Sequence, residues 1–305
     1  MNLEDNNRFF LIEFYGEYFM DDFKTIMGIF LRGLLMGTSD IMPGISGGTI
    51  ALITGIYDKL IGSISNIKFM FLKPLLKGNS SKFKKLLFEE IDFKFFIPLI
   101  LGMVIAMVMM AGIINFLLND YAAFTYSFFA GLILASIYIL YKQLDALNIK
   151  TISITIIFAV LGYVFVGLNP IQAAHSLPIL FISGFIAICA MLLPGISGSS
   201  ILLLLGQYEY MIAALHNLQI IDIIVFVFGA GLGFMSMSRI IKYLLENYKL
   251  ETVAGLIGIM IGSMRVPMMQ VVGTDSSNYL VCLVIGIIGM AIVLIVETKF
   301  DYELI

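Results

Sequence analysis

Tryptophan is absent from this 305-residue chain, and charged residues make up only 13% of it. A soluble globular protein carries about 25% charged residues, so the composition excludes that class. Histidine and cysteine are also scarce, with two of each, and Cys189 and Cys282 stand alone in apolar runs. Because neither a disulfide framework nor a metal-binding spacing can be built from them, we expect no metal site and no cofactor.

Apolar sequence, by contrast, is abundant. Hydrophobic residues make up 60% of the chain, and the mean hydropathy is +1.01. These values are typical of an integral membrane protein. The 28 glycines favour closely packed helices, and tyrosine and phenylalanine are left to anchor the membrane interfaces. We therefore expect an all-α polytopic membrane protein.

Two polar, glycine-rich breaks interrupt the apolar sequence. The first is DIMPGISGGT at residues 40–49, and the second is LPGISGSS at residues 193–200. Inside lipid, such a break frees backbone N–H and C=O groups, and each unmet group costs several kcal/mol. Two breaks at membrane depth therefore predict a buried, partly hydrated site that the other helices enclose. The residues expected to break the helices are Pro43, Gly44, Pro194 and Gly195.

Length decides how the apolar segments cross the membrane, because one helical span takes about 20 residues. The arms beside each break are shorter than this, so we expect two re-entrant hairpins, at residues 25–62 and 178–206. The aromatic residues of segment 1–24 are interrupted by acids, which predicts an interfacial segment and not a signal peptide. Six segments are long enough to span, at residues 95–118, 122–141, 151–167, 220–245, 252–269 and 279–296.

The distribution of basic residues orients these segments. By the positive-inside rule, the basic loop at residues 63–94 is cytoplasmic, and both chain termini are expected on the same side. Three spans separate the two hairpins, and an odd number of crossings places the hairpins on opposite faces. Residues 207–219 contain no lysine or arginine, as expected for an outer loop. The lysines of the basic loop are Lys68, Lys73, Lys77, Lys82, Lys84, Lys85 and Lys94.

The two halves also resemble each other, which predicts two inverted-topology repeats. The PGISG motif occurs in both breaks, followed at equal spacing by Tyr57 and Tyr208. GIINFLLNDY at residues 112–121 matches RIIKYLLENY at residues 239–248, and the copy expected inside has gained Arg239 and Lys242. Repeat 1 is expected at residues 25–150 with helices at 95–141, a connecting helix and outer loop at 151–177, and repeat 2 at 178–305 with helices at 220–296.

The breaks also carry the residues expected to bind substrate. Each opens the second helix of its hairpin, and a helix N-terminus exposes unpaired N–H groups and roughly half a positive charge. Serine and threonine hydroxyls add donors, so an anion is the expected ligand. The alternative is that the glycines only break the helix and the serines only cap it. The expected phosphate-binding residues here are Ser46, Gly47, Gly48, Thr49, Ser197, Gly198, Ser199 and Ser200.

Charged residues at membrane depth are costly and usually functional. Arg32, Arg239 and Arg265 are expected to contact phosphate, because a guanidinium binds it through two parallel hydrogen bonds. The alternatives are an ion pair for Arg32 and side chains that reach the interface for the other two. Asp40 has no acidic counterpart in the second half, where Met191 stands. We expect Asp40 to be an ion-coupling group that binds a proton; a pair with Arg32 or Arg239, or sodium held by freed carbonyls, are the alternatives.

These motifs resemble the polyprenyl-phosphate transporter family, long filed as a domain of unknown function. The resemblance rests on Gly37 to Leu60, with Asp40 and the PGISGGT core, and on Met191 to Tyr208. It implies a bacterial or archaeal plasma-membrane protein that moves undecaprenyl phosphate, or a related polyprenyl phosphate, from the outer to the inner leaflet. The lipid carrier is then available for reuse in cell-envelope synthesis.

Two other functions are compatible with parts of the sequence. A transporter of a small soluble anion would need the same breaks and arginines. An intramembrane lipid phosphatase would need a nucleophile with acid–base partners, and the two histidines, His175 and His216, fall in expected outer loops. We therefore expect a transporter and not an enzyme. Its expected partners are a polyprenyl phosphate, the membrane and a coupling proton or sodium ion, with no nucleic acid; a homo-oligomer stays open.

Overall fold

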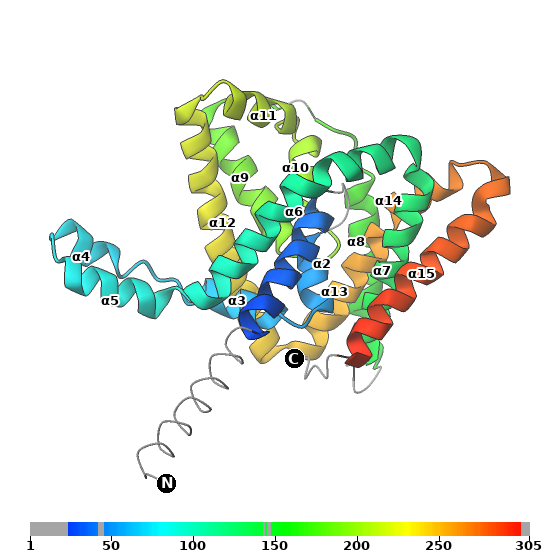
Figure 1. The fold of residues 1–305 in the computed structure, drawn as a ribbon, viewed down its shortest axis with the longest axis horizontal. Helices are drawn as coiled ribbons and strands as arrows, with labels where there is room; N and C mark the ends of the chain where they lie inside the picture. Colours follow the sequence, from blue (N-terminus) through cyan, green and yellow to red (C-terminus); the bar gives the residue numbers. More distant parts are fainter. Residues whose placement is uncertain (1–23, 42–45, 143, 145–147, 172, 300–305) are drawn as a thin grey trace, which may run out of the picture.

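The structure is a computed structural model that describes residues 24–41, 46–142, 144, 148–171 and 173–299. Within these residues every regular element is a helix, and Figure 1 shows how the helices are arranged. The interfacial segment expected at residues 1–24 lies outside the described residues, apart from residue 24. So do Pro43 and Gly44, which were expected to break the first helix.

Six segments of the described chain are long and apolar enough to cross a membrane. They correspond to the six spans expected from the sequence, which confirms an all-α polytopic membrane protein. A short 3₁₀ helix, η1 (Ser276–Asn278), precedes the last of them. The helices are α6 (Phe93–Asp120), α7 (Ala122–Lys142), α8 (Ile149–Val166), α12 (Ile220–Asn247), α13 (Lys249–Ser263) continued by α14 (Arg265–Val272), and α15 (Tyr279–Lys299).

The fifth span is interrupted, whereas the sequence predicted one continuous helix. α13 ends at Ser263 and α14 begins at Arg265. Pro267 explains the interruption, because proline has no N–H group to bond to the carbonyl four residues earlier, and its ring clashes with that carbonyl. The residue four positions before Pro267 is Ser263, where α13 ends.

The second arm of each hairpin is divided into two short helices. A glycine with positive φ follows the first of them in both arms: Gly55 at +69° and Gly206 at +66°. This left-handed conformation ends a helix and favours glycine. The expected outer loop at residues 207–219 therefore contains a helix. The helices of the two arms are α2 (Gly47–Ile53) and α3 (Tyr57–Ser65) in the first, and α10 (Gly198–Leu204) and α11 (Tyr208–His216) in the second.

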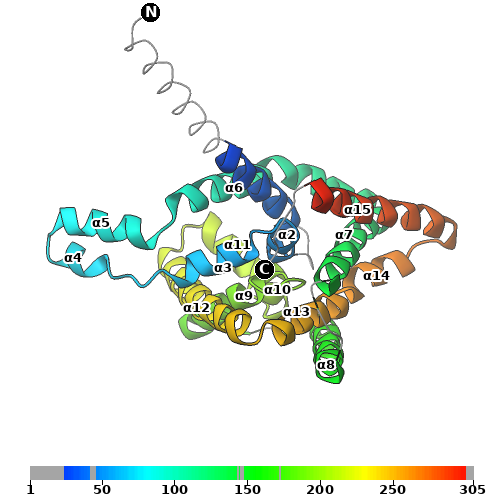
Figure 2. The ribbon, with the colours of Figure 1, turned by 90° about the horizontal axis from the view of Figure 1, so that it is seen from below.

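The basic segment between the first hairpin and α6 contains two further helices, α4 (Leu72–Leu76) and α5 (Ser80–Glu90). Asn79 caps α5 by accepting the N–H of Lys82 at 3.0 Å, and Asp92 caps α6 by accepting the N–H of Phe95 at 3.1 Å. Figures 1 and 2 both show α4 and α5 projecting sideways from the body of the molecule.

Glycines let neighbouring spans approach closely. α9 (Leu177–Met191) packs against α12 at Gly229, where an added Cβ would lie 2.1 Å from the carbonyl oxygen of Phe181. α7 packs against α15 in the same way, since a Cβ on Gly131 would lie 1.9 Å from the carbonyl oxygen of Gly286. Figure 2 shows both helix pairs side by side. Larger residues at these two glycines would therefore separate the helices.

The two broken segments approach the middle of the molecule from opposite ends. In Figure 1, the helix at residues 24–40 rises from the lower edge and α9 descends from the upper edge. The main core of buried side chains includes Ile29 and Met36 of the first of these helices, together with Tyr57, Leu140 and Met260. Inverted repeats stay a prediction, and this arrangement is the one that they require.

Candidate functional site

The two breaks are in direct contact, although they lie in different halves of the chain. The hydroxyl of Ser46 donates to the carbonyl of Met191 at 3.1 Å. In the opposite direction, the backbone N–H of Gly195 donates to Oγ1 of Thr49 at 2.9 Å. These bonds cross between the hairpins, so each break completes the hydrogen bonding of the other. The freed backbone groups that a break leaves in lipid are met here by protein.

Tyr57 makes a third bond between the hairpins, which the sequence did not predict as a functional contact. Its hydroxyl donates to the carbonyl of Leu192 at 2.9 Å, and its side chain is 2% exposed. The only sequence signal was its match with Tyr208 in the second half, which is 38% exposed. The equivalent tyrosines therefore occupy different environments.

Tyr57→Phe should lower the free energy of unfolding by about 1–3 kcal/mol, because the buried carbonyl of Leu192 loses its donor. Tyr208→Phe is the matched control and should change stability by less than about 0.5 kcal/mol, as an exposed substitution does. Thermal unfolding of both purified variants in detergent measures the difference. Equal losses in the two variants would show that the bond to Leu192 adds nothing.

In the first break, the backbone N–H groups at the start of α2 are bonded to acceptors within the break itself. The N–H of Gly47 donates to Oδ1 of Asp40 at 2.6 Å, and the N–H of Gly48 donates to the hydroxyl of Ser46 at 3.0 Å. The N–H of Thr49 bonds to the carbonyl of Ser46 at 2.9 Å. All seven residues of α2 are buried. In this conformation the donors at the start of α2 are therefore occupied. The Asp40 carboxyl group lies where an anion was expected, and Ser46 caps the helix.

One oxygen of Asp40 stands out among the described residues. Oδ2 is buried and has no hydrogen-bond partner. The arginines considered as partners bond elsewhere: Nε of Arg32 donates to the carbonyl of Thr54 at 3.0 Å, and Nη2 of Arg239 to that of Ile67 at 2.9 Å. A buried polar atom without a partner is rare and calls for an explanation, such as a proton or a cation that belongs there.

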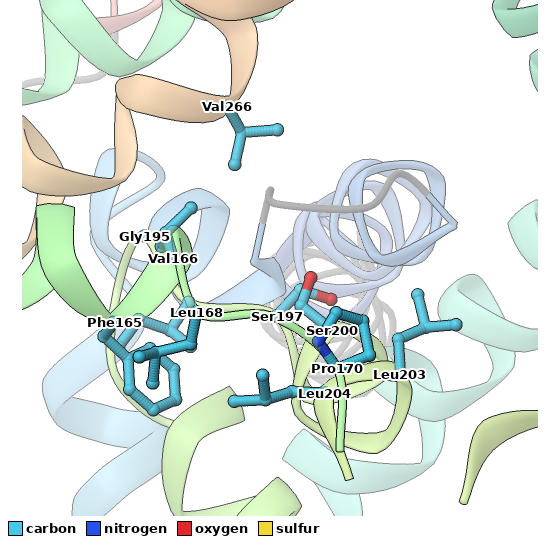
Figure 3. Close-up of a pocket in the computed structure, with 11 residues that line it drawn as sticks. Phe165, Val166, Leu168, Pro170, Gly195, Ser197, Ser200, Leu203, Leu204 and Val266 are labelled. Carbon is cyan, nitrogen blue, oxygen red and sulfur yellow. The ribbon is translucent and has the colours of Figure 1, made fainter. Parts of the chain in front are cut away.

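The second break is open. Ser197 and Ser200 line a cavity of about 190 Å³, and Figure 3 shows the two side chains next to each other on one wall. The hydroxyl of Ser199, which does not line this cavity, lies 2.7 Å from that of Ser197. In contrast to α2, only Ile201 of α10 is buried. The remaining wall is mostly apolar and comes from Phe165, Val166, Leu168, Pro170, Gly195, Ile196, Leu203, Leu204 and Val266.

A wider cavity of about 690 Å³ adjoins the first and shares Pro170 and Leu203 with it. Its other lining includes the polar side chains of His175 and of three residues of α11, namely Tyr208, Glu209 and Tyr210. Together the two cavities extend from the end of the molecule that carries α11 to the hydroxyls of Ser197 and Ser200 in the second break.

His175 is held by several partners, whereas the sequence suggested a solvated loop residue. Its ring stacks on Tyr210 with centroids 4.1 Å apart, and its Nδ1 lies 3.0 Å from Oε1 of Gln207. Gln207 is fully buried and donates to the carbonyl of Ala173 at 3.0 Å. Tyr210 in turn donates to Asp222, and this hydrogen bond raises the pKa of the Tyr210 phenol. No sequence pattern indicated this cluster, because His175 lies 32 positions from Gln207 in the chain.

The remaining predicted residues fall in different places. Gly195 has a φ of +90°, and Gly198 lies where an added Cβ would be 3.1 Å from the carbonyl oxygen of Ala187. Arg265 begins α14, donates to the carbonyl of Tyr163 at 3.0 Å, and stacks over that ring at 4.4 Å from its centroid. It therefore adjoins the cavity through the next residue, Val266. Neither of the other two arginines lines the cavity.

Comparison with known proteins places the chain among membrane transporters. The family model described as undecaprenyl phosphate translocase-like matches residues 36–279, which contain both breaks. A protein of Vibrio cholerae serotype O1 named polyprenyl-phosphate transporter is 37% identical over 238 residues, covering 78% of this chain and 76% of that protein. A protein of Staphylococcus aureus with the same name is 35% identical over 291 residues, covering 90% of this chain and 96% of that protein. No solved structure matches the chain.

Proposed function

The chain belongs to the undecaprenyl phosphate translocase-like family, and from this premise we propose that it transports polyprenyl phosphate across the membrane that its helices span. It is a transporter and not an enzyme. The finer proposal is that the lipid moves from the outer to the inner leaflet of a plasma membrane, with both chain termini in the cytoplasm. The carrier is thereby returned for reuse in cell-envelope synthesis.

The observation that carries this proposal is the cavity beside the second break. Moving a lipid phosphate needs a polar path for the headgroup, while the polyprenyl tail can stay in lipid. Ser197 and Ser200 offer hydroxyl donors on one wall, and most of the other lining residues, among them Phe165 and Leu204, are apolar. A site with a few polar groups in a mostly apolar cavity suits an amphiphile better than a small hydrated anion.

The unequal burial of the two breaks suggests how the site works. α2 is enclosed, whereas α10 borders a cavity at the end of the molecule that carries α11. If the two halves are related by inversion, a second conformation would enclose the second break and open the first. Alternating between the two conformations would expose the site to each side of the membrane in turn. We infer that this conformation is open on the side of α11, which the absence of basic residues at 207–219 assigns to the outside.

The other sequence-based assignments stay proposals with different degrees of geometric support. The hydroxyls of Ser197, Ser199 and Ser200 are best placed for phosphate in this conformation. The donors of Ser46, Gly47 and Gly48 would need the first break to open before they could bind it. Asp40 is proposed to bind the coupling proton, with sodium as the alternative.

Ser200→Ala should slow translocation of undecaprenyl phosphate roughly fivefold, because one hydrogen bond to the headgroup, about 1 kcal/mol, is lost. The assay uses purified protein in vesicles, labelled undecaprenyl phosphate and detection of the lipid in one leaflet. Ser236→Ala is the control, since that hydroxyl bonds to the carbonyl of Leu232 on α12, outside the cavity.

The same assay tests the proposed function as a whole. Vesicles with wild-type protein should exchange the lipid between leaflets much faster than empty vesicles, and added inorganic phosphate should not compete. Strong competition by inorganic phosphate would instead favour a transporter of a small soluble anion. Equal rates with and without protein would exclude translocation of this lipid.

A further inference from the structure

A groove lies along the lipid-facing side of α12, apart from the site described above. Its volume is about 500 Å³ and its lining is almost entirely apolar. It shares no residue with the two cavities near the second break. The lining residues are Phe69, which precedes α4, and Ile223, Ile224, Val227, Phe228, Gly231, Leu232 and Met235 of α12.

The groove faces away from the helix that α12 packs against. Gly229 and Gly233 face α9, where added Cβ atoms would lie 2.1 Å and 2.5 Å from the carbonyl oxygens of Phe181 and Phe185. Gly231 lies two positions from each, on the opposite side of a helix with about 3.6 residues per turn. An added Cβ there would meet nothing within 4 Å. The groove is thus open space on the lipid-facing side of α12.

The wall opposite α12 is held in place by hydrogen bonds. Both oxygens of Glu90 accept backbone N–H groups, from Lys68 at 3.0 Å and from Met70 at 2.9 Å. The residue between them, Phe69, has a φ of +57°, a conformation that costs a side-chain-bearing residue about 1–2 kcal/mol. Phe69 also packs edge-on against Phe71, with centroids 5.6 Å apart. Such strain persists only where the surroundings enforce it, and here it places an aromatic side chain in the groove.

Positive charge gathers where the groove meets this wall. Arg239 continues the row Val227, Gly231 and Met235 at spacings of four, and Nη2 of Arg239 donates to the carbonyl of Ile67 at 2.9 Å. Lys242 reaches Oδ1 of Asn66 at 3.4 Å, and exposed Lys68 follows Ile67. Glu246, 4.0 Å from Lys242, and Glu90, which accepts the backbone N–H of Lys68, offset two of the three positive charges. The result is an apolar groove with net positive charge at one end.

We propose that this groove binds an anionic glycerophospholipid of the surrounding membrane, with an acyl chain along α12 and the phosphate at Lys68, Arg239 and Lys242. An apolar channel ending in cations complements a lipid with an acyl chain and an anionic head, and juxtamembrane Lys and Arg attract such lipids. The groove has no connection to the hydroxyls of the second break, which favours a resident lipid over the transported one. α12 packs against α9, the helix that leads into the second break. A lipid bound along α12 would therefore stabilise the position of α9.

The test counts retained lipids by native mass spectrometry, after purification from vesicles with equal amounts of phosphatidylglycerol and phosphatidylcholine. Wild-type protein should retain phosphatidylglycerol selectively. The double variant Arg239→Gln with Lys242→Gln should bind it roughly 25-fold more weakly, from a loss of roughly fivefold for each cation. The control is Lys84→Gln with Lys85→Gln on α5, which removes two positive charges outside the groove and should leave retention unchanged.

A second pair of variants tests the acyl-chain part of the groove. Gly231→Phe fills the groove and should lower retention of phosphatidylglycerol at least fivefold. Gly112→Phe is its control on α6, because a Cβ there also meets nothing within 4 Å, and it should retain the lipid.

Several outcomes would overturn the proposal. They are equal retention of the two phospholipids, equal loss in Gly231→Phe and Gly112→Phe, and unchanged retention in the double variant. Displacement of phosphatidylglycerol by added undecaprenyl phosphate in wild type but not in Gly231→Phe would assign the groove to the transported lipid instead. None of these measurements depends on translocation, so the proposed function can fail without affecting this inference.

Discussion

Asp40→Asn should fold normally and translocate polyprenyl phosphate at a rate that no longer responds to pH. Oδ1 of Asp40 accepts the N–H of Gly47, and the asparagine side chain keeps an acceptor for it. The wild-type Oδ2 is buried without a partner among the described residues, a position in which an ionised oxygen is strongly disfavoured. We therefore propose that a proton occupies it here, and asparagine reproduces this neutral form permanently.

The expected sign for the wild type follows from charge. A neutral Asp40 does not repel the arriving phosphate, whereas a carboxylate does, so inward transport should rise as the outside pH falls. The rise should be roughly tenfold per pH unit in the range where the carboxyl group is mostly ionised before it binds a proton. Vesicles with a fixed inner pH and a varied outer pH measure this response directly.

Asp92→Asn is a matched control, because Asp92 also accepts an N–H at the start of a helix but its side chain is 41% exposed. This variant should keep the wild-type pH response. If Asp40→Asn responded to pH like the wild type, Asp40 would not be the coupling group. A response to sodium that is present in wild type and lost in Asp40→Asn, without any pH response, would replace the proton by sodium.

Gly195→Ala should lower the free energy of unfolding by about 2–5 kcal/mol and abolish most transport. The φ of Gly195 is +90°, which costs a residue with a Cβ about 1–2 kcal/mol. The new Cβ would also lie 2.8 Å from the hydroxyl oxygen of Ser263 and 3.1 Å from Cα of Met260, and such overpacking adds about 1–3 kcal/mol. Any shift would strain the bond from Gly195 to Thr49, which joins the two breaks.

Gly78→Ala separates these two causes. Gly78 also has a positive φ, +69°, but an added Cβ there meets nothing within 4 Å. The control should therefore lose only about 1–2 kcal/mol and transport normally. Thermal unfolding in detergent, together with the leaflet assay, measures both effects. Similar losses in Gly195→Ala and Gly78→Ala would mean that α13 does not press on the second break.

Much of the architecture could be predicted from the order of residues alone. The six spans appear as apolar segments of sufficient length, and their predicted bounds agree with the helices to within a few residues, except where Pro267 divides one of them. The PGISG motif in both breaks indicated the family that the comparisons confirm. These features were accessible because hydrophobicity and helix length are local properties of a chain in a bilayer.

The site depended on contacts that no local pattern specifies. The sequence offered Arg32 or Arg239 as a partner for Asp40, and the fold gave it the N–H of Gly47 instead. The repeated motifs predicted equivalent breaks, yet Tyr57 is buried against Leu192 while Tyr208 lies at an open cavity.

The sequence by itself therefore determined the class of the protein, its spans, its family and the two places where its helices break. Only the tertiary structure decided which break is enclosed, which hydroxyls face a cavity and which buried oxygen, within the part of the chain that the structure describes, has no hydrogen-bond partner. The physical reason is that burial and hydrogen bonding depend on groups such as Ser46 and Met191, which are 145 positions apart in the chain and meet only when the helices pack.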